Sequence, residues 1–528
     1  ENNAHPHATD KVAIVHNGII DNYLELKAEL EAKQHRFETE TDTEIVVHLV
    51  TDYLMQGMSP VEAAQASFKR LQGAYAILMI FAGEHDLMIG VRQGTPMTIG
   101  YGEGKNAGRM YMASDAIALA AYTNRVSYLE DGDWAIIRKD GAEIFTMDGA
   151  PVERTVRVST VTSAMTSKAG YRHYMLKEIH EQPEVIGNTL HAHLHPATGQ
   201  AVFKDFNFDF ASLKRLHITA CGTAFYAGLV ARYWFEELAG LPTEVDIASE
   251  YSHRSLPPSD DAATLVISQS GETFDTLEAL RFAKSQGQKT IAVLNVLEST
   301  IDREADQSVY TLAGPEQSVA SSKAFTTQLS TLACLAMVAA RARGKLTEER
   351  EREIAAALRE VPSRMAEILR LDDQIKSVAQ QIQNARSVLY LGRGRSYPIA
   401  MEGALKLKEV SYIHAEGYAA GEMKHGPIAL IDENLPVVAI APNDRWLEKT
   451  LSNLEEASAR GAQLLVIGDQ KATKALEKHG KWFIPMPEMT SDAASLVAPI
   501  LYAVPVQLLA YHTAVWKGTD VDQPRNLA

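Results

Sequence analysis

Cysteine is nearly absent from this sequence: only Cys221 and Cys334 occur among 528 residues. So few cysteines exclude a disulfide scaffold and a cysteine-rich metal site. They fit a reducing compartment, so we expect a cytoplasmic protein. Basic residues are also few, because 51 Lys and Arg stand against 67 Asp and Glu, a net charge of −16. That charge repels phosphate backbones and anionic lipid, so we expect neither nucleic acid nor a membrane as a partner.

Long apolar runs are missing as well. The most apolar stretch, Leu329–Ala340, is too short to span a bilayer. The sequence begins with Glu1 rather than Met and shows no signal-peptide pattern, which leaves a processed chain or a fragment as the alternatives. The pair His5 and His7 has no further ligand at a suitable spacing, so we expect no metal site there.

The length predicts three domains at about 150 residues each. Residues 1–160 mix short strands, Gly-rich turns and a few helices, which is typical of an α+β domain with a largely antiparallel sheet. Within it we predict a strand at Lys11–His16, a turn at Asn17-Gly18, and a capping box from Thr41 to Glu44 at a helix start. Residues 161–205 are expected to form a linker and a connecting segment, because the linker part is rich in Ser, Thr and Ala without a sustained period.

The rest of the chain alternates strand, glycine turn and helix, and it does so twice. Gly394 follows Gly222 at the same distance along the chain as Glu422 follows Glu250. The alternation predicts doubly wound parallel sheets, and the constant spacing predicts two copies of one domain. We place these copies at residues 206–345 and 370–515, followed by a tail over residues 516–528.

The loop Ser-Gln-Ser-Gly-Glu-Thr at residues 268–273 joins a predicted buried strand to a helix. Free backbone N–H groups and the positive end of the helix dipole favour an anion there, and the hydroxyl groups add neutral donors suited to phosphate. The alternative is that Ser270 simply caps the helix. The place of the loop, at the carboxyl end of a parallel strand, favours phosphate. The second copy has Ala441 to Asp444 at this point, without the hydroxyl groups.

Glu402, Lys406 and Glu409 fall at i, i+4 and i+7 and therefore share one face of a predicted helix. One interpretation is a solvated row of salt bridges. The other is a carboxylate base whose pKa is set by the neighbouring lysine and which moves a proton between adjacent carbons. His425 lies in a predicted loop and is either a surface residue or an acid/base near neutral pH.

Together these motifs resemble the isomerase half of the glucosamine-6-phosphate synthases, the isomerizing glutamine–fructose-6-phosphate aminotransferases. The two parts of that half are sugar-isomerase (SIS) domains, and a class-II (N-terminal-nucleophile) glutamine amidotransferase domain precedes them. The fold class implied by the resemblance is α/β with an α+β N-terminal part. The resemblance covers the whole chain and rests on Cys-Gly-Thr at 221–223, the loop 268–273, Val-Ala-Ser-Ser-Lys-Ala-Phe-Thr at 319–326, the helix 402–409, Lys-His-Gly-Pro at 424–427 and the ending Asp-Gln-Pro-Arg-Asn-Leu-Ala at 522–528.

The resemblance also implies roles in the sugar half. Glu409 is expected to shuttle a proton between C1 and C2, with Lys406 and Glu402 beside it. His425, lent by the partner subunit of a homodimer, is expected to help open the sugar ring. Ala224 stands where the family usually has a serine, so one donor worth about 0.5–1.5 kcal/mol is missing and we expect weaker phosphate binding. The residues implied in holding the sugar phosphate are Thr223, Ser268, Gln269, Ser270, Thr273, Val319 and Ser321.

In the glutaminase half, the resemblance implies an oxyanion hole at Asn17 and Gly18, and it implies that Asp42 takes the glutamine α-amino group. For Asp42 the alternative is an acid that is simply favourable in the first turn of a helix. The nucleophilic N-terminal cysteine of the family has no match here, since Cys334 lies in an apolar helix and is expected in a core. Its imine-forming lysine follows Asn-Leu-Ala, where this sequence stops at Ala528. We therefore expect a chain truncated at both ends and inactive by itself in the complete reaction.

The implied activity is the glutamine-dependent conversion of D-fructose 6-phosphate to D-glucosamine 6-phosphate plus glutamate, the first step toward UDP-N-acetylglucosamine. No metal or organic cofactor is expected, because the imine and the acid/base residues suffice. Two alternatives stay open: a SIS-domain deglycase that cleaves sugar–amine adducts, and a sugar-phosphate sensor without catalysis. The glutamine-pocket residues weigh against the deglycase, and a sensor has no use for Glu409 or His425.

Overall fold

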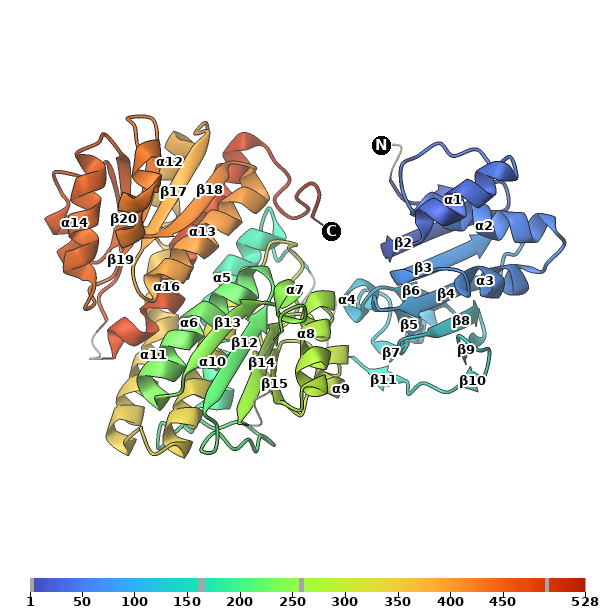
Figure 1. Cartoon of the computed structure of the whole chain (residues 1–528), viewed down its shortest axis with the longest axis horizontal. Coiled ribbons are helices and arrows are strands. Elements are labelled where there is room, and N and C mark those ends of the chain that lie inside the picture. The colour runs from blue at the N-terminus through green and yellow to red at the C-terminus, as the bar shows by residue number, and fades with distance from the viewer. Residues whose placement is uncertain (1–3, 160–166, 256–260, 490–492, 528) are drawn as a thin grey trace. The chain divides into compact units, whose positions relative to one another are not determined.

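A computed structural model describes residues 4–159, 167–255, 261–489 and 493–527 of the chain. The chain divides into two compact units, Glu1–Ser167 and Lys168–Ala528 (Figure 1). Most of the predicted linker falls on residues 160–166, which lie outside the described residues. The domain boundaries proposed from the sequence stay predictions.

The first unit contains two antiparallel sheets, as predicted for an α+β domain. The strands of the larger sheet are, in spatial order, β1 (His7–Ala8), β2 (Val12–Ile20), β3 (Gly73–Phe81), β4 (Met88–Gln93), β8 (Asp133–Arg138), β9 (Gly141–Thr146) and β10 (Pro151–Val152). Those of the smaller sheet are β11 (Arg157–Val158), β7 (Arg125–Tyr128), β5 (Thr98–Tyr101) and β6 (Met110–Ala113). The helical segments are α1 (Tyr23–Ala32), α2 (Thr43–Met55), α3 (Pro60–Phe68), η1 (Gly104–Asn106) and α4 (Ala116–Leu119).

The two larger apolar cores of this unit determine how its sheets and helices pack. The first packs side chains of α1, α2 and α3, such as Leu30, Ile45 and Phe68, against β2, β3, β4 and β8 of the larger sheet. The second lies between the two sheets and includes Ile99 and Ile137. The helices and the smaller sheet thus help to cover the larger sheet and fix the position of β2, which carries the predicted oxyanion hole.

The predicted turn at Asn17-Gly18 is wrong, because β2 continues through both residues to Ile20 and pairs with β3 throughout. Gly18 has a φ of +122°, and a Cβ atom at this position would lie 2.1 Å from the carbonyl oxygen of Ala74. The glycine therefore serves a close approach of two strands rather than a change of direction.

The predicted capping box at Thr41 is also wrong. Helix α2 begins at Thr43, and its N-cap Asp42 makes no side-chain cap hydrogen bond. The Glu44 carboxylate instead accepts hydrogen bonds from the backbone N–H groups of Glu38 and Thr39, at 2.7 and 2.8 Å. The capping-box pattern assigned the Glu44 carboxylate to the N-terminus of α2, but this carboxylate binds the backbone of the preceding loop.

The second unit contains two five-stranded parallel sheets. The strands of the first are, in spatial order, β13 (Thr243–Ile247), β12 (Arg215–Ala220), β14 (Ala262–Ser268), β15 (Lys289–Leu294) and β16 (Gln307–Tyr310). Those of the second are β18 (His414–Ala419), β17 (Ser387–Gly392), β19 (Pro436–Ala441), β20 (Gln463–Gly468) and β21 (Trp482–Pro485). The helical segments are α5 (Tyr174–His193), α6 (Gly222–Ala239), α7 (Ala248–Tyr251), α8 (Phe274–Ser285), α9 (Thr300–Glu304), α10 (Lys323–Ala342), α11 (Glu348–Leu369), α12 (Asp372–Ile382), α13 (Ser396–Ser411), η2 (Ala420–His425), η3 (Pro427–Leu430), α14 (Leu447–Ser458), α15 (Gln470–Ala475) and α16 (Ala494–Lys517).

The two sheets are copies of one design, as the spacing predicted. Strand β17 follows β12 at the same distance along the chain as Gly394 follows Gly222, and the strand order is the same in both sheets, with the first strand of each copy in second place. Gly222 and Gly394 open the turns after these strands with φ angles of +52° and +53°. One apolar core joins the copies, because α6 packs against α13 and α10 while α16 packs against α13 and α11 (Figure 1).

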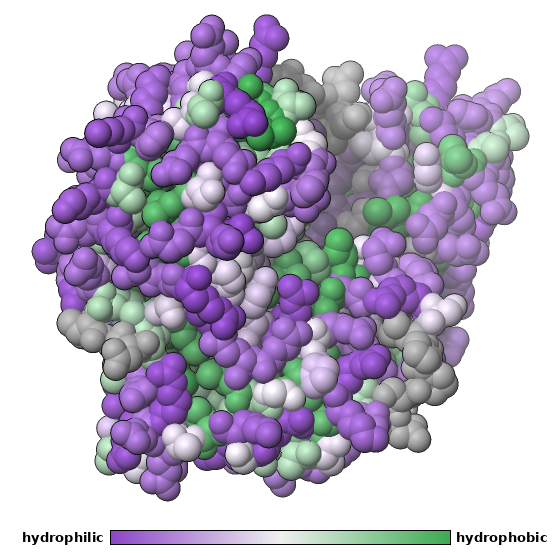
Figure 2. All heavy atoms as spheres, turned by 60° about the vertical axis from the view of Figure 1, so that its left-hand side comes forward, coloured by the Kyte–Doolittle hydropathy of each residue, from purple (hydrophilic) through white to green (hydrophobic). Residues whose placement is uncertain are grey.

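Helix α16 is long and apolar enough to cross a membrane, and it is the one helix of this kind within the described residues. The sequence analysis took Leu329–Ala340 as the most apolar stretch. That stretch lies in α10, whereas the helix that is long and apolar enough to span a membrane is α16, so this prediction was wrong. Of the apolar window of α16, 89% is buried inside the protein, as expected for a core helix. On the face shown in Figure 2, hydrophilic residues dominate and apolar ones form small scattered groups.

Candidate active site

The three ionisable residues predicted to share one face of α13 form a buried cluster. Glu402 is 0% and Lys406 1% exposed, while the Glu409 side chain is 21% exposed. The Lys406 ammonium lies 3.8 Å from Glu402 Oε1 and forms an ion pair with Glu409. The interpretation of this face as a solvated row of salt bridges is therefore wrong.

Burial sets the charge of this cluster. It raises the pKa of Glu402 to about 8, and the charge of Lys406 only partly opposes it. Burial lowers the pKa of Lys406, but Glu409 and Glu402 outweigh it and the net pKa is raised. At neutral pH Glu402 is thus mostly protonated and Lys406 is charged, and of the two carboxyl groups Glu409 is the one that pairs with Lys406 and is partly exposed.

Residues of the first SIS-like copy contact the ionisable cluster on α13, which belongs to the second copy. The Thr223 hydroxyl, in the first turn of α6, donates to Glu402 Oε1 at 3.3 Å. Ser321 donates to Glu316 at 3.0 Å, and the Glu316 charge acts on both Glu402 and Lys406. The structure therefore brings together Thr223, Ser321 and the α13 cluster, which the sequence analysis had placed in one site.

The chain tail borders the same region. The Val319 N–H donates to the Asp522 carbonyl oxygen at 3.2 Å, and Thr519 Oγ1 donates to the Val410 carbonyl of α13 at 2.6 Å. The Asp522 carboxylate also accepts from the N–H groups of Tyr174 and Met175, the first residues of α5, at 2.9 and 3.0 Å. These contacts hold the tail between the 319–323 segment and the end of α13.

The predicted phosphate loop lies at the carboxyl end of β14. Ser268 Oγ accepts the Gly271 N–H at 3.0 Å and lies 3.0 Å from Thr273 Oγ1, and Ser270 Oγ accepts the Glu272 N–H at 3.2 Å. The N-cap of α8 is Thr273, which makes no side-chain cap hydrogen bond. The interpretation of Ser270 as a simple cap is therefore wrong, and the first N–H groups of α8 keep the capacity to bind an anion.

The remaining members of the phosphate site lie at the same sheet edge. The carbonyl oxygen of Gln269 accepts the N–H of Asn295, which follows β15. Cys221, the N-cap of α6, accepts a hydrogen bond from Thr276 of α8, so the starts of the two helices are neighbours. Ala224 follows within the first turn of α6.

His425 is not part of the α13 cluster within this chain. It ends η2, its side chain is exposed, and it forms no hydrogen bond or ion pair with any described residue. Its neighbour Lys424 pairs with Glu456 at 2.7 Å. The second cysteine, Cys334, is fully buried in α10, and burial raises the pKa of its thiol to about 12, as expected for a core residue.

In the first unit, the proposed glutamine-site residues converge on the end of β2. Asn17 and Gly18 are exposed, and the Asp42 Oδ2 atom accepts the Ile20 N–H at 2.8 Å. Asp42 Oδ1 lies 3.9 Å from His16 Nδ1, and burial lowers the pKa of that imidazole. The carboxylate is thus tied to β2 rather than to its own helix.

His5 and His7 lie beside α2. His5 Nε2 lies 3.3 Å from Thr43 Oγ1, and His7 Nε2 lies 3.3 Å from Thr41 Oγ1. No group of three or more His, Cys, Asp or Glu side chains able to hold a metal ion is found among the residues that the structure describes.

Comparisons with known proteins agree with this architecture. A glutamine amidotransferase domain matches residues 1–121, and a SIS domain matches residues 209–338 and 381–517. The glutamine–fructose-6-phosphate aminotransferase [isomerizing] of Brucella abortus is 54% identical over 528 residues, which is 100% of this chain and 86% of the relative. That of Bradyrhizobium diazoefficiens is 55% identical over the same shares.

The chain belongs to the glutamine–fructose-6-phosphate aminotransferase family. The C-terminal domain of glucosamine-fructose-6-phosphate aminotransferase from Francisella tularensis is similar in structure, with a TM-score of 0.65 and 44% identity. The match covers 68% of this chain and 99% of that one. The predicted fold class, a glutamine amidotransferase domain followed by two SIS domains, is confirmed.

Sequence reasoning missed two carboxylates of this family member. Glu316 accepts the N–H groups of Ser322 and Ala324, at 2.9 and 3.2 Å, and so orders the segment that carries Ser321. Glu178 of α5 accepts the N–H groups of Gln317 and Ser318. Neither residue stands in a regular helical spacing with its partners, so no periodic signal could have revealed it.

Proposed function

We propose that the protein converts fructose 6-phosphate and glutamine to glucosamine 6-phosphate and glutamate, and that Glu409 moves the proton in the isomerisation. The observation that carries the role of Glu409 is the buried cluster on α13. Glu402 is held neutral and Lys406 charged, and Glu409 is the partly exposed carboxylate that pairs with Lys406. A carboxylate so placed accepts a proton from C1 of the sugar and returns it to C2.

The sugar phosphate is proposed to lie across the first copy, with its phosphate at the Ser268–Thr273 loop. The uncapped N-terminus of α8 supports this, because its N–H groups and dipole favour an anion. Thr223 and Ser321 are then proposed to contact the sugar between the phosphate loop and the α13 cluster. Thr223 donates to Glu402 of that cluster, and Ser321 donates to Glu316 beside it. Gln269 and Val319 complete the proposed contacts.

In the glutaminase domain, we assign the oxyanion hole to Asn17 and Gly18 and the α-amino site to Asp42. The strand geometry supports this assignment, because both residues are exposed near the strand end that Asp42 borders. Such donors stabilise the negative charge that develops on the amide oxygen during hydrolysis. A deglycase would have no use for this arrangement.

The test uses the protein expressed from its complete gene, with glutamine labelled by heavy nitrogen in the amide. We expect labelled glucosamine 6-phosphate from the wild type and almost none from Glu409→Gln, with fructose 6-phosphate binding retained. The matched control is Glu448→Gln, whose carboxylate is 79% exposed on α14 and should leave the rate unchanged. Unlabelled product, or full activity of Glu409→Gln, would count against the assignment and favour a deglycase or a sensor.

We also propose a cytoplasmic homodimer in which His425 completes the site of the partner subunit. The exposure of His425 and its lack of a bonding partner in the described chain support this. If the proposal holds, mixing the separately inactive variants Glu409→Gln and His425→Ala under conditions that exchange subunits restores part of the activity. Failure of the mixture to recover activity, with exchange shown by co-purification of a tagged variant with the untagged one, would place His425 in its own subunit's site or outside it.

A further inference from the structure

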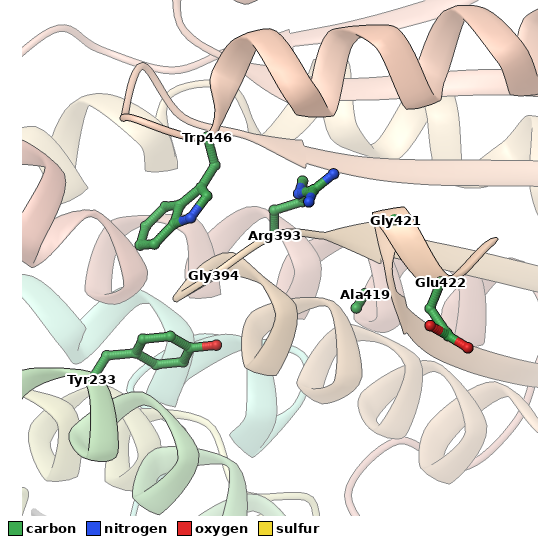
Figure 3. A pocket seen from close by; sticks show the side chains of 7 residues that line it. All are labelled: Tyr233, Arg393, Gly394, Ala419, Gly421, Glu422 and Trp446. Carbon is green, nitrogen blue, oxygen red and sulfur yellow. The ribbon is translucent and has the colours of Figure 1, made fainter. Parts of the chain in front are cut away.

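A second cavity lies in the second SIS copy, away from the α13 cluster. It has a volume of about 480 Å³, and its lining includes Tyr233, Arg393, Gly394, Glu422 and Trp446. In the view of Figure 3, the two aromatic side chains lie on one side, Glu422 lies on the other, and Arg393 lies between them. A cavity of this volume is of the size that small-molecule ligands occupy.

The position of the cavity in the fold is the one where open parallel sheets bind ligands. Arg393 and Gly394 follow β17, Glu422 follows β18, and Trp446 follows β19, so the lining comes from the carboxyl ends of three adjacent strands. The chain leaves β17 for β18 on one side and later returns to β19 on the other, which makes this a topological switch point.

The duplication gives the cavity a counterpart in the first copy. Gly394 corresponds to Gly222, Glu422 to Glu250, and Trp446 to Phe274, the first residue of α8, all three at one constant spacing along the chain. The cavity thus lies at the same edge of its sheet as the phosphate loop does in the first copy. The second copy has lost the hydroxyl groups of that loop but offers guanidinium and aromatic groups instead.

Of the three arginines in and around the cavity, two pair with a carboxylate and one does not. Arg395 and Arg445 both pair with Glu237, and Arg445 also stacks on Trp446 at 4.3 Å. Arg393 is different, because within the described chain its guanidinium has a neutral partner alone, the Asn453 side-chain oxygen at 2.9 Å, and no carboxylate. Its charge is therefore available to a ligand.

The other lining groups suit a sugar. The Glu422 carboxylate is exposed and forms no ion pair with any residue that the structure describes, so it can accept hydrogen bonds from hydroxyl groups. The ring centroids of Tyr233 and Trp446 lie 6.3 Å apart with the planes at 74°. Arg445 and Gly394 already contact the Trp446 ring. Tyr233 therefore offers the apolar surface for the C–H face of a sugar, and Trp446 forms the adjoining apolar wall. The lining residues include no lysine beside a carboxylate, in contrast to the α13 cluster.

We propose that this cavity is a second, non-catalytic binding site for a sugar phosphate. Arg393 binds the phosphate through its fork of N–H donors. Tyr233 contacts the sugar ring beside the wall formed by Trp446, and Glu422 accepts hydrogen bonds from the sugar hydroxyl groups. The site is distinct from the proposed reaction site, whose phosphate loop and proton-moving carboxylate lie on other elements.

The experiment is calorimetric titration of the protein from its complete gene with glucosamine 6-phosphate. We expect two molecules bound per chain in the wild type. Arg393→Met should weaken one of the two sites roughly ten- to a hundredfold, the loss expected for a charged hydrogen-bonding partner, and leave the other unchanged. Ser270→Ala should weaken the other site alone. The control Lys471→Met removes a cation that pairs with Glu448 and does not line the cavity, and should change neither.

A second variant covers the case in which Arg393→Met fails to fold. Glu422→Gln changes an exposed side chain and should weaken the same site as Arg393→Met. One molecule per chain in the wild type, removed by Ser270→Ala, overturns the second site and leaves the proposed function standing. Two molecules whose affinities ignore both Arg393→Met and Glu422→Gln also overturn it. Competition by inorganic phosphate at the Arg393-dependent site supports the assignment of the phosphate to this arginine, and its absence contradicts that assignment.

Discussion

The replacement Glu402→Gln tests the charge state on which the proposed mechanism depends. Burial raises the pKa of Glu402 from 4.5 to about 8, so the folded chain keeps this proton at a pH where the unfolded chain has released it. The proton therefore stabilises the folded state at low pH, and this contribution is lost as the pH rises through about 8. Glutamine has nearly the shape of the protonated acid but has no proton to lose.

The magnitude follows from the two pKa values. Between pH 6 and pH 9, the group takes about 2–3 kcal/mol from the free energy of unfolding of the wild type, because up to about pH 8 the folded chain holds a proton that the unfolded chain has released. The variant lacks this loss. We therefore expect the stability advantage of Glu402→Gln over the wild type to grow by about 2–3 kcal/mol between pH 6 and pH 9.

The assay is urea unfolding at both pH values, followed by tryptophan fluorescence. Four of the five tryptophans lie in the second unit, and Trp234 is fully buried in the core shared by the two copies. Taking the difference in free energy of unfolding between variant and wild type cancels the contributions of the other titrating groups. Glu448→Gln, at an exposed carboxylate, serves as the matched control. Equal pH dependence of Glu402→Gln and wild type would refute the neutral state of Glu402, and with it the argument that distinguishes Glu409 from Glu402 as the base.

Three further outcomes follow from local geometry. Ser59→Ala removes the capping box formed at the start of α3 and should lower the free energy of unfolding of the first unit by about 0.5–2 kcal/mol in urea titrations. Asp522→Ala leaves two N–H groups of α5 without their acceptor and should cost about 1–3 kcal/mol in the second unit, measured in the same way. Gly18→Ala puts a methyl group 2.1 Å from the Ala74 carbonyl and should abolish glutamine hydrolysis; normal hydrolysis would exclude Gly18 from the oxyanion hole.

The sequence predicted the larger features because they repeat or are periodic. The constant spacing of Gly222 from Gly394 and of Glu250 from Glu422 identified the duplication, and the structure shows matching strand order in both copies. Helical periodicity also predicted that Glu402, Lys406 and Glu409 share one face of a helix. It did not predict that this face is buried, because burial depends on α6 and α16, which come from distant parts of the chain and pack on α13.

Local patterns were less reliable where a distant strand or loop competes for the same group. Asn17-Gly18 has the composition of a turn, but pairing with β3 keeps it in a strand. Glu44 stands in the register of a capping box, yet the loop at Glu38 and Thr39 takes its carboxylate. Glu316 could not be singled out at all, since its importance lies in the backbone N–H groups that it orders.

The division of labour between the two SIS copies explains how they could diverge. The α13 carboxylates belong to the second copy, while the Thr223 hydroxyl that bonds to Glu402 and the Glu316 charge that acts on it belong to the first. Neither copy contains the proposed reaction site alone, so selection for catalysis acts on the first copy's phosphate loop and on the second copy's helix. The corresponding loop of the second copy is outside that constraint. It could lose its hydroxyl groups without loss of catalysis, and the neighbouring cavity at Arg393 is therefore a sound place to look for binding without turnover.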